Sequence, residues 1–163
     1  MIRRCSHAGV RFVSRWESFS PRAVDIGDGT ITIGYGTTSA VHPEIELGDT
    51  ITEEKAWRWL RSFLNHECVP AIPRRFRMKQ QEVDALASFA YNLGTGVLFD
   101  PAQSTLCHRL KSREGRHFRD RCRIYTEELP KWRSPGTQFE EGLAKRRAPE
   151  VALATRGTYS SDH

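Results

Sequence analysis

A change of hydrophobic period early in the chain restricts its fold more than any other feature. Residues 18–38, SFSPRAVDIGDGTITIGYGTT, combine glycine turn signals with a β-branched run. This pattern predicts a hairpin with strands near 21–26 and 30–34, followed by a polar loop or short strand to about Asp49. Elsewhere, apolar residues recur with helical spacing to about residue 154. The sequence therefore predicts an α+β fold.

The helical stretches carry start and stop signals. Ser6 is expected to cap a first short helix that leads into Glu17, and Thr50 or Thr52 caps the stretch EEKAWRWLRSFLNHE, which Pro70 and Pro73 stop. Further helices are expected at about 79–93, after Ser104, at about 116–127 and at about 139–154, with Pro149 breaking or kinking the last. The residues after Arg156 are expected to be loose.

One domain of two lobes is the expected organisation. The small lobe spans about 15–52 and a linking helix about 53–69. The helical lobe spans about 74–155 and includes the N-terminal helix. We expect a cleft where the lobes meet, because binding sites favour such junctions.

Charge and composition narrow the partners. The 163 residues include 25 Lys+Arg and 20 Asp+Glu, a net charge of +5, which suits nucleic acid or an anionic envelope surface. The basic residues are interleaved with acids and no helix-turn-helix or zinc pattern occurs, so we expect no nucleic-acid partner. The apolar runs are too short for stable membrane insertion.

The cysteines and arginines are given structural roles. The four cysteines lack CxxC spacing and no apolar export signal precedes them, so we expect free thiols, no metal site and no cofactor. Arg116, Arg119, Arg121 and Arg123 are expected to form a solvated helix face. Arg146 and Arg147 are expected to stabilise the helical lobe.

One group of residues has the composition of an acid–base site. Glu17 lies where a helix meets a strand, Asp25 and Asp28 flank the hairpin turn, and Thr32 follows in the second strand. Glycoside hydrolysis uses two carboxyl groups, one protonated to serve the leaving oxygen and one ionised. On spacing alone, ordinary surface residues are the stronger interpretation, because surface Glu, Asp and Thr are common.

The sequence motifs around these residues resemble those of the phage-type lysozymes, glycoside hydrolase family 24. WESFSP, TITIGYGTT, LASFAYNLGTGVL, STLCHRL and GLAKRR occur in order, and the resemblance extends from about Val10 to Leu153. The family pattern places an Asp or Cys nine residues after its Glu, and a Thr six residues further. Glu17 and Thr32 keep the overall separation.

The sequence departs from this pattern at the second carboxylate. Ile26 occupies that position, with Asp25 one residue early and Asp28 two residues late. A one-residue shift normally turns a strand side chain to the other face. We favour Asp25 because it ends its strand as the family Asp does, with Asp28 as the alternative. A second departure, Thr37 in place of a frequent His, affects a position that is usually structural.

The resemblance implies roles for these residues and others. Glu17 would be the general acid, Asp25 the ionised partner, and Thr32 would position water or the second carboxylate. Substrate contacts are implied for Thr38, Tyr91, Asn92 and Thr105. The substrate would be bacterial peptidoglycan, cut at the β-1,4 bond between N-acetylmuramic acid and N-acetylglucosamine.

The resemblance also implies a biological setting. The chain would be an endolysin that lyses the host cell. It would be a monomer held in the host cytoplasm until a holin-type pore admits it to the periplasm. Two alternatives remain open, a peptidoglycan lytic transglycosylase and a non-catalytic peptidoglycan-binding protein of the same fold.

Overall fold

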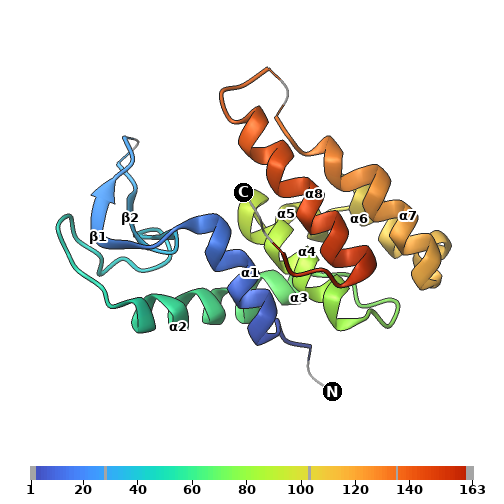
Figure 1. Ribbon diagram of the computed structural model, residues 1–163, viewed down its shortest axis with the longest axis horizontal. Coiled ribbons are helices and arrows are strands. Elements are labelled where there is room, and N and C mark those ends of the chain that lie inside the picture. The colour runs from blue at the N-terminus through green and yellow to red at the C-terminus, as the bar shows by residue number, and fades with distance from the viewer. Residues whose placement is uncertain (1–2, 28, 103, 135, 161–163) are drawn as a thin grey trace.

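The computed structural model describes residues 3–27, 29–102, 104–134 and 136–160. The elements, in chain order, are α1 (His7–Glu17), β1 (Ser20–Asp25), β2 (Ile31–Gly34), β3 (Thr37–Thr38), α2 (Glu53–Phe63), the π-helix η1 (Leu64–Cys68), α3 (Val69–Ala71), α4 (Gln80–Leu93), α5 (Gly96–Phe99), α6 (Thr105–Lys111), the 3-10 helix η2 (Arg113–Arg116), α7 (Phe118–Glu128), the 3-10 helix η3 (Leu129–Lys131) and α8 (Glu140–Arg156). The sheet lies at one side and helices α4 to α8 at the other, with α2 running between them (Figure 1). The predicted α+β class is confirmed.

The sheet is antiparallel, in the order β1-β2-β3. Thr32 in the middle strand lies opposite Val24 of β1 and opposite Thr38 of β3, while Asp25 lies opposite Ile31. A Cβ at Gly34 would lie only 2.9 Å from the Cβ of Ala56, so the missing side chain lets β2 approach α2 closely. The predicted hairpin is confirmed, and β3 is a short strand.

The helix starts follow the predicted caps. Ser6 Oγ accepts a hydrogen bond from the Gly9 N–H at 3.0 Å, and Thr52 rather than Thr50 caps α2. The prediction that Pro70 ends the second helix was wrong. The Val69 N–H reaches back five residues to the Leu64 carbonyl, and this wider π turn leads into α3. Pro70 stands in the first turn of α3, where a missing donor is tolerated.

Helix α4 forms the centre of the helical lobe and packs most extensively against α8. The expected solvated face of the basic helix holds for Arg116, Arg119 and Arg123, which are exposed. It was wrong for Arg121, which is 2% exposed. Its guanidinium donates to both carboxylate oxygens of Glu82 on α4, at 2.6 and 3.0 Å. Helical periodicity shows which residues share a face, and here the partner on α4 makes that position buried.

The end of the chain is more ordered than expected. Helix α8 continues through Pro149 without a break and ends at Gly157, which adopts a left-handed conformation. Beyond it, the Tyr159 hydroxyl donates to Asp84 Oδ2 at 2.6 Å. Asp84 also accepts from the N–H and the hydroxyl of Ser6, at 2.9 and 2.5 Å. One buried carboxylate therefore holds both the cap of α1 and the tail.

All four cysteines are free thiols, as expected, and three are buried. Burial raises the pKa of the Cys68 thiol to about 12, with the charge of Glu67 adding to the effect, so this group stays protonated at neutral pH. Among the described residues no helix combines the length and apolar character that a bilayer crossing requires.

Candidate active site

Glu17 is the last residue of α1, and its side chain is 20% exposed. Its side chain lies beside Gly36, which has a φ of +87° in the turn before β3. A Cβ there would lie 3.6 Å from Glu17 Oε2 and 3.5 Å from the Tyr91 hydroxyl. Both are ordinary van der Waals separations, so the positive φ of this turn, rather than a lack of space, is what favours glycine beside the carboxyl group.

Arg146 of α8 holds the other carboxylate oxygen. Its Nη1 donates to Glu17 Oε1 at 2.5 Å, and its Nε donates to Glu150 Oε1 at 3.2 Å. The Arg146 side chain is 5% exposed and Glu150 is fully buried. Because Oε1 is engaged by the arginine, Oε2 is the oxygen on the side of Gly36.

Arg147 completes this charged group. Its Nη1 lies 2.8 Å from Glu150 Oε2, and its Nη2 donates to Asn92 Oδ1. Two arginines and two glutamates thus form a group with balanced charge at the junction of α1, α4 and α8, called here the Glu17–Glu150 cluster (Glu17, Arg146, Arg147 and Glu150). Buried charges are tolerated when they are paired in this way.

Tyr91 lies beside Glu17 at the end of α4. Its hydroxyl donates to the Tyr35 carbonyl at 2.6 Å, and its ring packs edge-on against Phe63 with the centroids 5.5 Å apart. Burial raises the pKa of this phenol, and the negative charge of Glu17 raises it further. Tyr91 therefore remains a neutral hydrogen-bond donor that links the two lobes.

A pocket of about 280 Å³ opens over these residues. The lining side chains come from both lobes and from α2, and they are Glu17, Gly36, Thr37, Thr38, Val41, His42, Trp59, Phe63, Tyr91 and Asn92. The sequence-predicted residues Glu17, Thr38, Tyr91 and Asn92 are therefore brought together. Thr105 is exposed at the start of α6 and does not line this pocket.

Thr32 adjoins the pocket through the sheet. It lies opposite Thr38, so the two side chains share a face. The Thr32 hydroxyl is buried and makes no hydrogen bond to any residue in the described part of the chain. An unpaired buried hydroxyl is costly unless a ligand or water satisfies it.

Asp25 lies on the other face of the sheet. It stands opposite Ile31, whereas Val24 is opposite Thr32. Its side chain is exposed, and Oδ1 accepts from the Gly27 N–H at 2.8 Å. By strand alternation, Ile26 continues the Thr32 face. Asp28 lies outside the described residues.

Comparison with known proteins gives the family. Residues 14–150 match the family model described as phage lysozyme. This chain belongs to the phage lysozyme family. The family resemblance seen in its sequence motifs is thereby confirmed.

Relatives of this chain include two phage endolysins. It is 33% identical over 157 residues to an endolysin of Bacillus phage B103, covering 93% of this chain and 54% of that protein. It is 30% identical over 157 residues to an endolysin of Bacillus phage PZA, covering 94% and 55%. The chain thus spans about half the length of these curated relatives.

Solved structures share the fold of this chain. The muramidase domain of SpmX from Asticaccaulis excentricus superposes with a TM-score of 0.73 at 28% identity, covering 93% of this chain and 97% of that one. A P22 lysozyme variant superposes with a TM-score of 0.72 at 27% identity, with the same coverage.

The sequence did not predict the contact of Arg146 with Glu17. The two residues are 129 positions apart, and a basic pair on a helix gives no sign of what it faces. The aromatic side of the pocket was also missed. His42 stacks on Trp59 with ring centroids 4.1 Å apart. Trp59 was only one of several aromatics in an amphipathic helix.

Proposed function

We propose that this phage lysozyme hydrolyses peptidoglycan at the β-1,4 bond between N-acetylmuramic acid and N-acetylglucosamine. The observation that carries the proposal is the Glu17 carboxyl group in a pocket between the lobes, with Oε1 bonded to Arg146 and Oε2 beside Gly36. The relatives named as endolysins and as a muramidase domain support the same chemistry.

In the proposed reaction Glu17 is the general acid. In the molecules whose Glu17 carries a proton on Oε2, this proton would pass to the leaving glycosidic oxygen as positive charge develops on the sugar ring, and the carboxylate left behind is the form that pairs with Arg146. Arg146 would keep the carboxyl group from rotating away, and Tyr91 and Asn92 would line the floor under the sugar. Thr32 would hydrogen-bond the attacking water, which supplies the partner that its hydroxyl lacks.

We propose Asp25 as the ionised carboxylate, with Asp28 as the alternative. In the described conformation Asp25 lies on the face of the sheet that points away from the Thr32 side chain, and it accepts a hydrogen bond from the Gly27 N–H. A catalytic role for Asp25 in the pocket therefore requires the end of the hairpin to turn. Two single variants, Asp25→Asn and Asp28→Asn, distinguish these assignments. The variant that removes the partner loses activity, and the other keeps it.

A second candidate activity is favoured by one observation. Within the described part of the chain, Glu17 is the one carboxyl group that lines the pocket. A lytic transglycosylase needs only one. The substrate's own 6-hydroxyl attacks C1 while Glu17 protonates the leaving oxygen, and the carboxylate then takes the hydroxyl proton. The product is an anhydro sugar, one water lighter than the hydrolysis product.

The test is turnover of purified peptidoglycan, followed by soluble product and mass spectrometry. Glu17→Gln is expected to lower turnover by about 100-fold or more, because acid–base catalysis contributes about that much. Glu46→Gln, an exposed glutamate of the small lobe, is the matched control and should match wild type. Full activity of Glu17→Gln would overturn the assignment. Reducing ends in the products favour hydrolysis, and anhydro ends favour transglycosylation.

We further propose that the protein acts as a monomer in host lysis, reaching the wall from the cytoplasm through a holin-type pore. The names of its endolysin relatives support this setting. Expression in a bacterial host with and without a pore-forming partner tests it, since lysis should require both proteins.

A further inference from the structure

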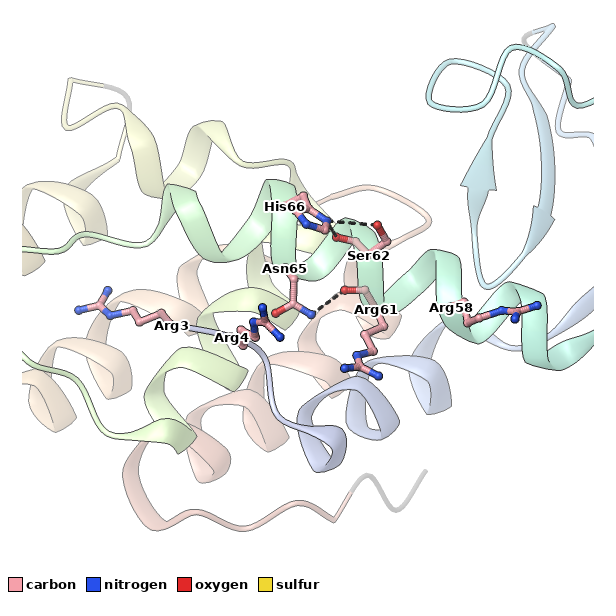
Figure 2. Close-up of a pocket in the computed structure, with 7 residues that line it drawn as sticks. All are labelled: Arg3, Arg4, Arg58, Arg61, Ser62, Asn65 and His66. Atoms are coloured by element: carbon pink, nitrogen blue, oxygen red, sulfur yellow. Dashed lines mark hydrogen bonds between the residues drawn. The ribbon is translucent and has the colours of Figure 1, made fainter. Parts of the chain in front are cut away.

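A second pocket, of about 500 Å³, is strongly basic and is not used by the proposed reaction. The described residues that line it include four arginines and no carboxylate, and they are Arg3, Arg4, Arg58, Arg61, Ser62, Asn65 and His66. We call it the arginine pocket. In Figure 2 the arginines run in a row from Arg3 through Arg4 and Arg61 to Arg58. The charge is thus spread along the pocket rather than gathered at one point.

The walls of the arginine pocket are built by two segments held together. Residues 58, 61, 62, 65 and 66 share one face of α2 and the π-helix, by their spacing of three and four. The N-terminal segment is bonded to this face because the Cys5 N–H donates to Asn65 Oδ1 at 2.9 Å. Arg3 donates to the carbonyls of Pro73 and Phe76, each at 2.9 Å.

Little of the positive charge in this pocket is neutralised. Arg58 faces Glu54 at 3.6 Å, but both side chains are at least two-thirds exposed, so the pair is weak. The guanidinium groups of Arg4 and Arg61 make no hydrogen bond or ion pair with any residue in the described ranges. Burial lowers the pKa of Arg3, and the charge of Arg74 lowers it further. An anion placed here would relieve this crowding of like charge.

We propose that the arginine pocket binds a linear phosphodiester polymer of the bacterial envelope, one whose phosphates are joined by small polyols. Planar guanidinium groups match phosphate oxygens with paired hydrogen bonds. Arg58 and Arg61 are helix neighbours with Cβ atoms about 5–6 Å apart, a spacing that allows contact with phosphates along one chain. Ser62 and Asn65 also line the pocket, but the Ser62 hydroxyl bonds His66 and the Asn65 amide bonds the backbone of Cys5 and Arg61, so the arginines are the main binding groups.

The lining favours such a polymer over single-stranded nucleic acid. Nucleic-acid channels combine basic residues with aromatic side chains on which bases stack. Among the residues with a described position, no Phe, Tyr or Trp lines the arginine pocket. The choice of an envelope polymer rests on the proposed function, which places the protein at the cell wall.

The arginine pocket is joined to the Glu17 pocket. A smaller hollow shares Ser62 and His66 with the arginine pocket, and it shares Trp59 and Phe63 with the Glu17 pocket. The three hollows are therefore neighbours along α2. A polymer held at one end would therefore keep the enzyme beside its glycan substrate and lengthen each encounter.

The test measures binding of a fluorescent glycerol-phosphate oligomer to the full chain by anisotropy, at 50 and 200 mM salt. Arg58→Gln/Arg61→Gln is expected to weaken binding at least tenfold. The slope of log binding constant against log salt concentration should become less steep by about 1.4, if each of the two lost phosphate contacts contributes about 0.7 as in single strands. The matched control, Arg119→Gln/Arg156→Gln, removes the same charge from exposed sites elsewhere and should change binding less than twofold.

Several outcomes would overturn the proposal. Equal weakening by both double variants means diffuse attraction by net charge, and absence of binding to wild type means no site. Tighter binding of poly(dT) assigns the pocket to nucleic acid, and tighter binding of polyglutamate assigns it to carboxylates. Unchanged thermal midpoints of both variants verify folding. Because the probe contains no peptidoglycan, the result is independent of the hydrolysis assay, and Glu17→Gln should bind it as wild type does.

Discussion

Removing Arg146 is expected to destabilise the protein because it upsets the charge balance of the Glu17–Glu150 cluster. With all four residues present the formal charges sum to zero, and the Arg146→Gln variant leaves one uncompensated negative charge. Breaking a buried ion pair from one side costs about 3–5 kcal/mol. Glu17 is 20% exposed and can regain some water, so we expect about 3 kcal/mol, at the lower limit.

The double variant Glu17→Gln/Arg146→Gln separates the effect of charge imbalance from the loss of individual contacts. Glu17→Gln alone leaves Arg146 bonded to Glu150 and keeps an amide oxygen as an acceptor, so we expect a loss of about 1 kcal/mol. The two changes together restore zero net charge. We therefore expect the double variant to lose about 2 kcal/mol rather than the additive 4, a coupling of about 2 kcal/mol between contacting residues.

Urea unfolding at pH 7, followed by circular dichroism, measures these free energies. Glu141→Gln/Lys145→Gln, an exposed pair on the same helix, is the control and should unfold as wild type does. Strict additivity of the two single variants would refute the charge-balance argument, as would an Arg146→Gln variant of wild-type stability.

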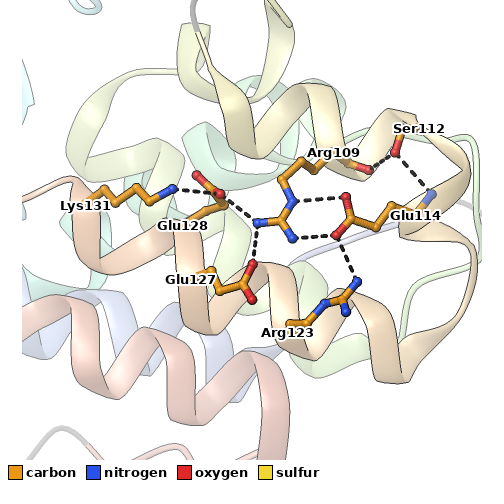
Figure 3. A network of polar contacts seen from close by, with 7 residues as sticks. All are labelled: Arg109, Ser112, Glu114, Arg123, Glu127, Glu128 and Lys131. Atoms are coloured by element: carbon orange, nitrogen blue, oxygen red, sulfur yellow. Dashed lines mark hydrogen bonds and ion pairs between the residues drawn. The ribbon is translucent and has the colours of Figure 1, made fainter.

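Other expectations follow from contacts elsewhere. Arg121→Met should lower the free energy of unfolding by about 3 kcal/mol in urea titrations, because Glu82 is left charged and buried. Gly36→Ala should cost about 1 kcal/mol through left-handed strain and should also slow peptidoglycan turnover, because the new Cβ contacts Tyr91 and Glu17. Arg109 bonds Glu114 in the network of Figure 3 and holds the pKa of that carboxyl below its usual range. This contribution is present at neutral pH and is lost as pH falls below about 4, so Arg109→Ala should flatten the acid side of the thermal-midpoint profile.

Each of these variants has a control. Arg119→Met removes an exposed arginine from the same helix as Arg121 and should leave stability unchanged. Gly48→Ala carries a similar positive φ with no atom near the new Cβ, so it should show the strain without the loss of turnover. Arg156→Ala should keep the acid-side slope. Equal effects in a variant and its control would contradict the contact invoked.

Local signals predicted the fold well because its caps and turns are set by neighbouring residues. Ser6, Thr52 and Ser104 cap helices through bonds to groups three residues away. The hairpin followed from β-branched residues beside glycines. What failed depended on distant partners. Arg121 is buried because Glu82 faces it, and the tail is ordered because Tyr159 meets Asp84.

The candidate site divides in the same way. The sequence motifs predicted four site residues that share one pocket, namely Glu17, Thr38, Tyr91 and Asn92. The role of Arg146 depends on the packing of α8 against α1, whose contacting residues are 129 positions apart. Local sequence patterns do not indicate a contact of that kind. The face of the sheet that the Asp25 side chain takes depends on the register of β1 against β2. The register pairs Thr32 with Val24 and leaves the carboxylate beside Ile31 on the other side.

Helix α1 is fixed at both ends to the helical lobe. Asp84 of α4 bonds Ser6 at its start, and Arg146 of α8 bonds Glu17 at its end. If the lobes swing apart to admit a glycan strand, the Glu17 carboxyl group therefore moves together with α4 and α8, and its ion pair with Arg146 stays intact. Thr32 and Gly36 move with the sheet. Opening would lengthen the gap between acid and water-binding hydroxyl, and closure would reset it around each bond to be cut.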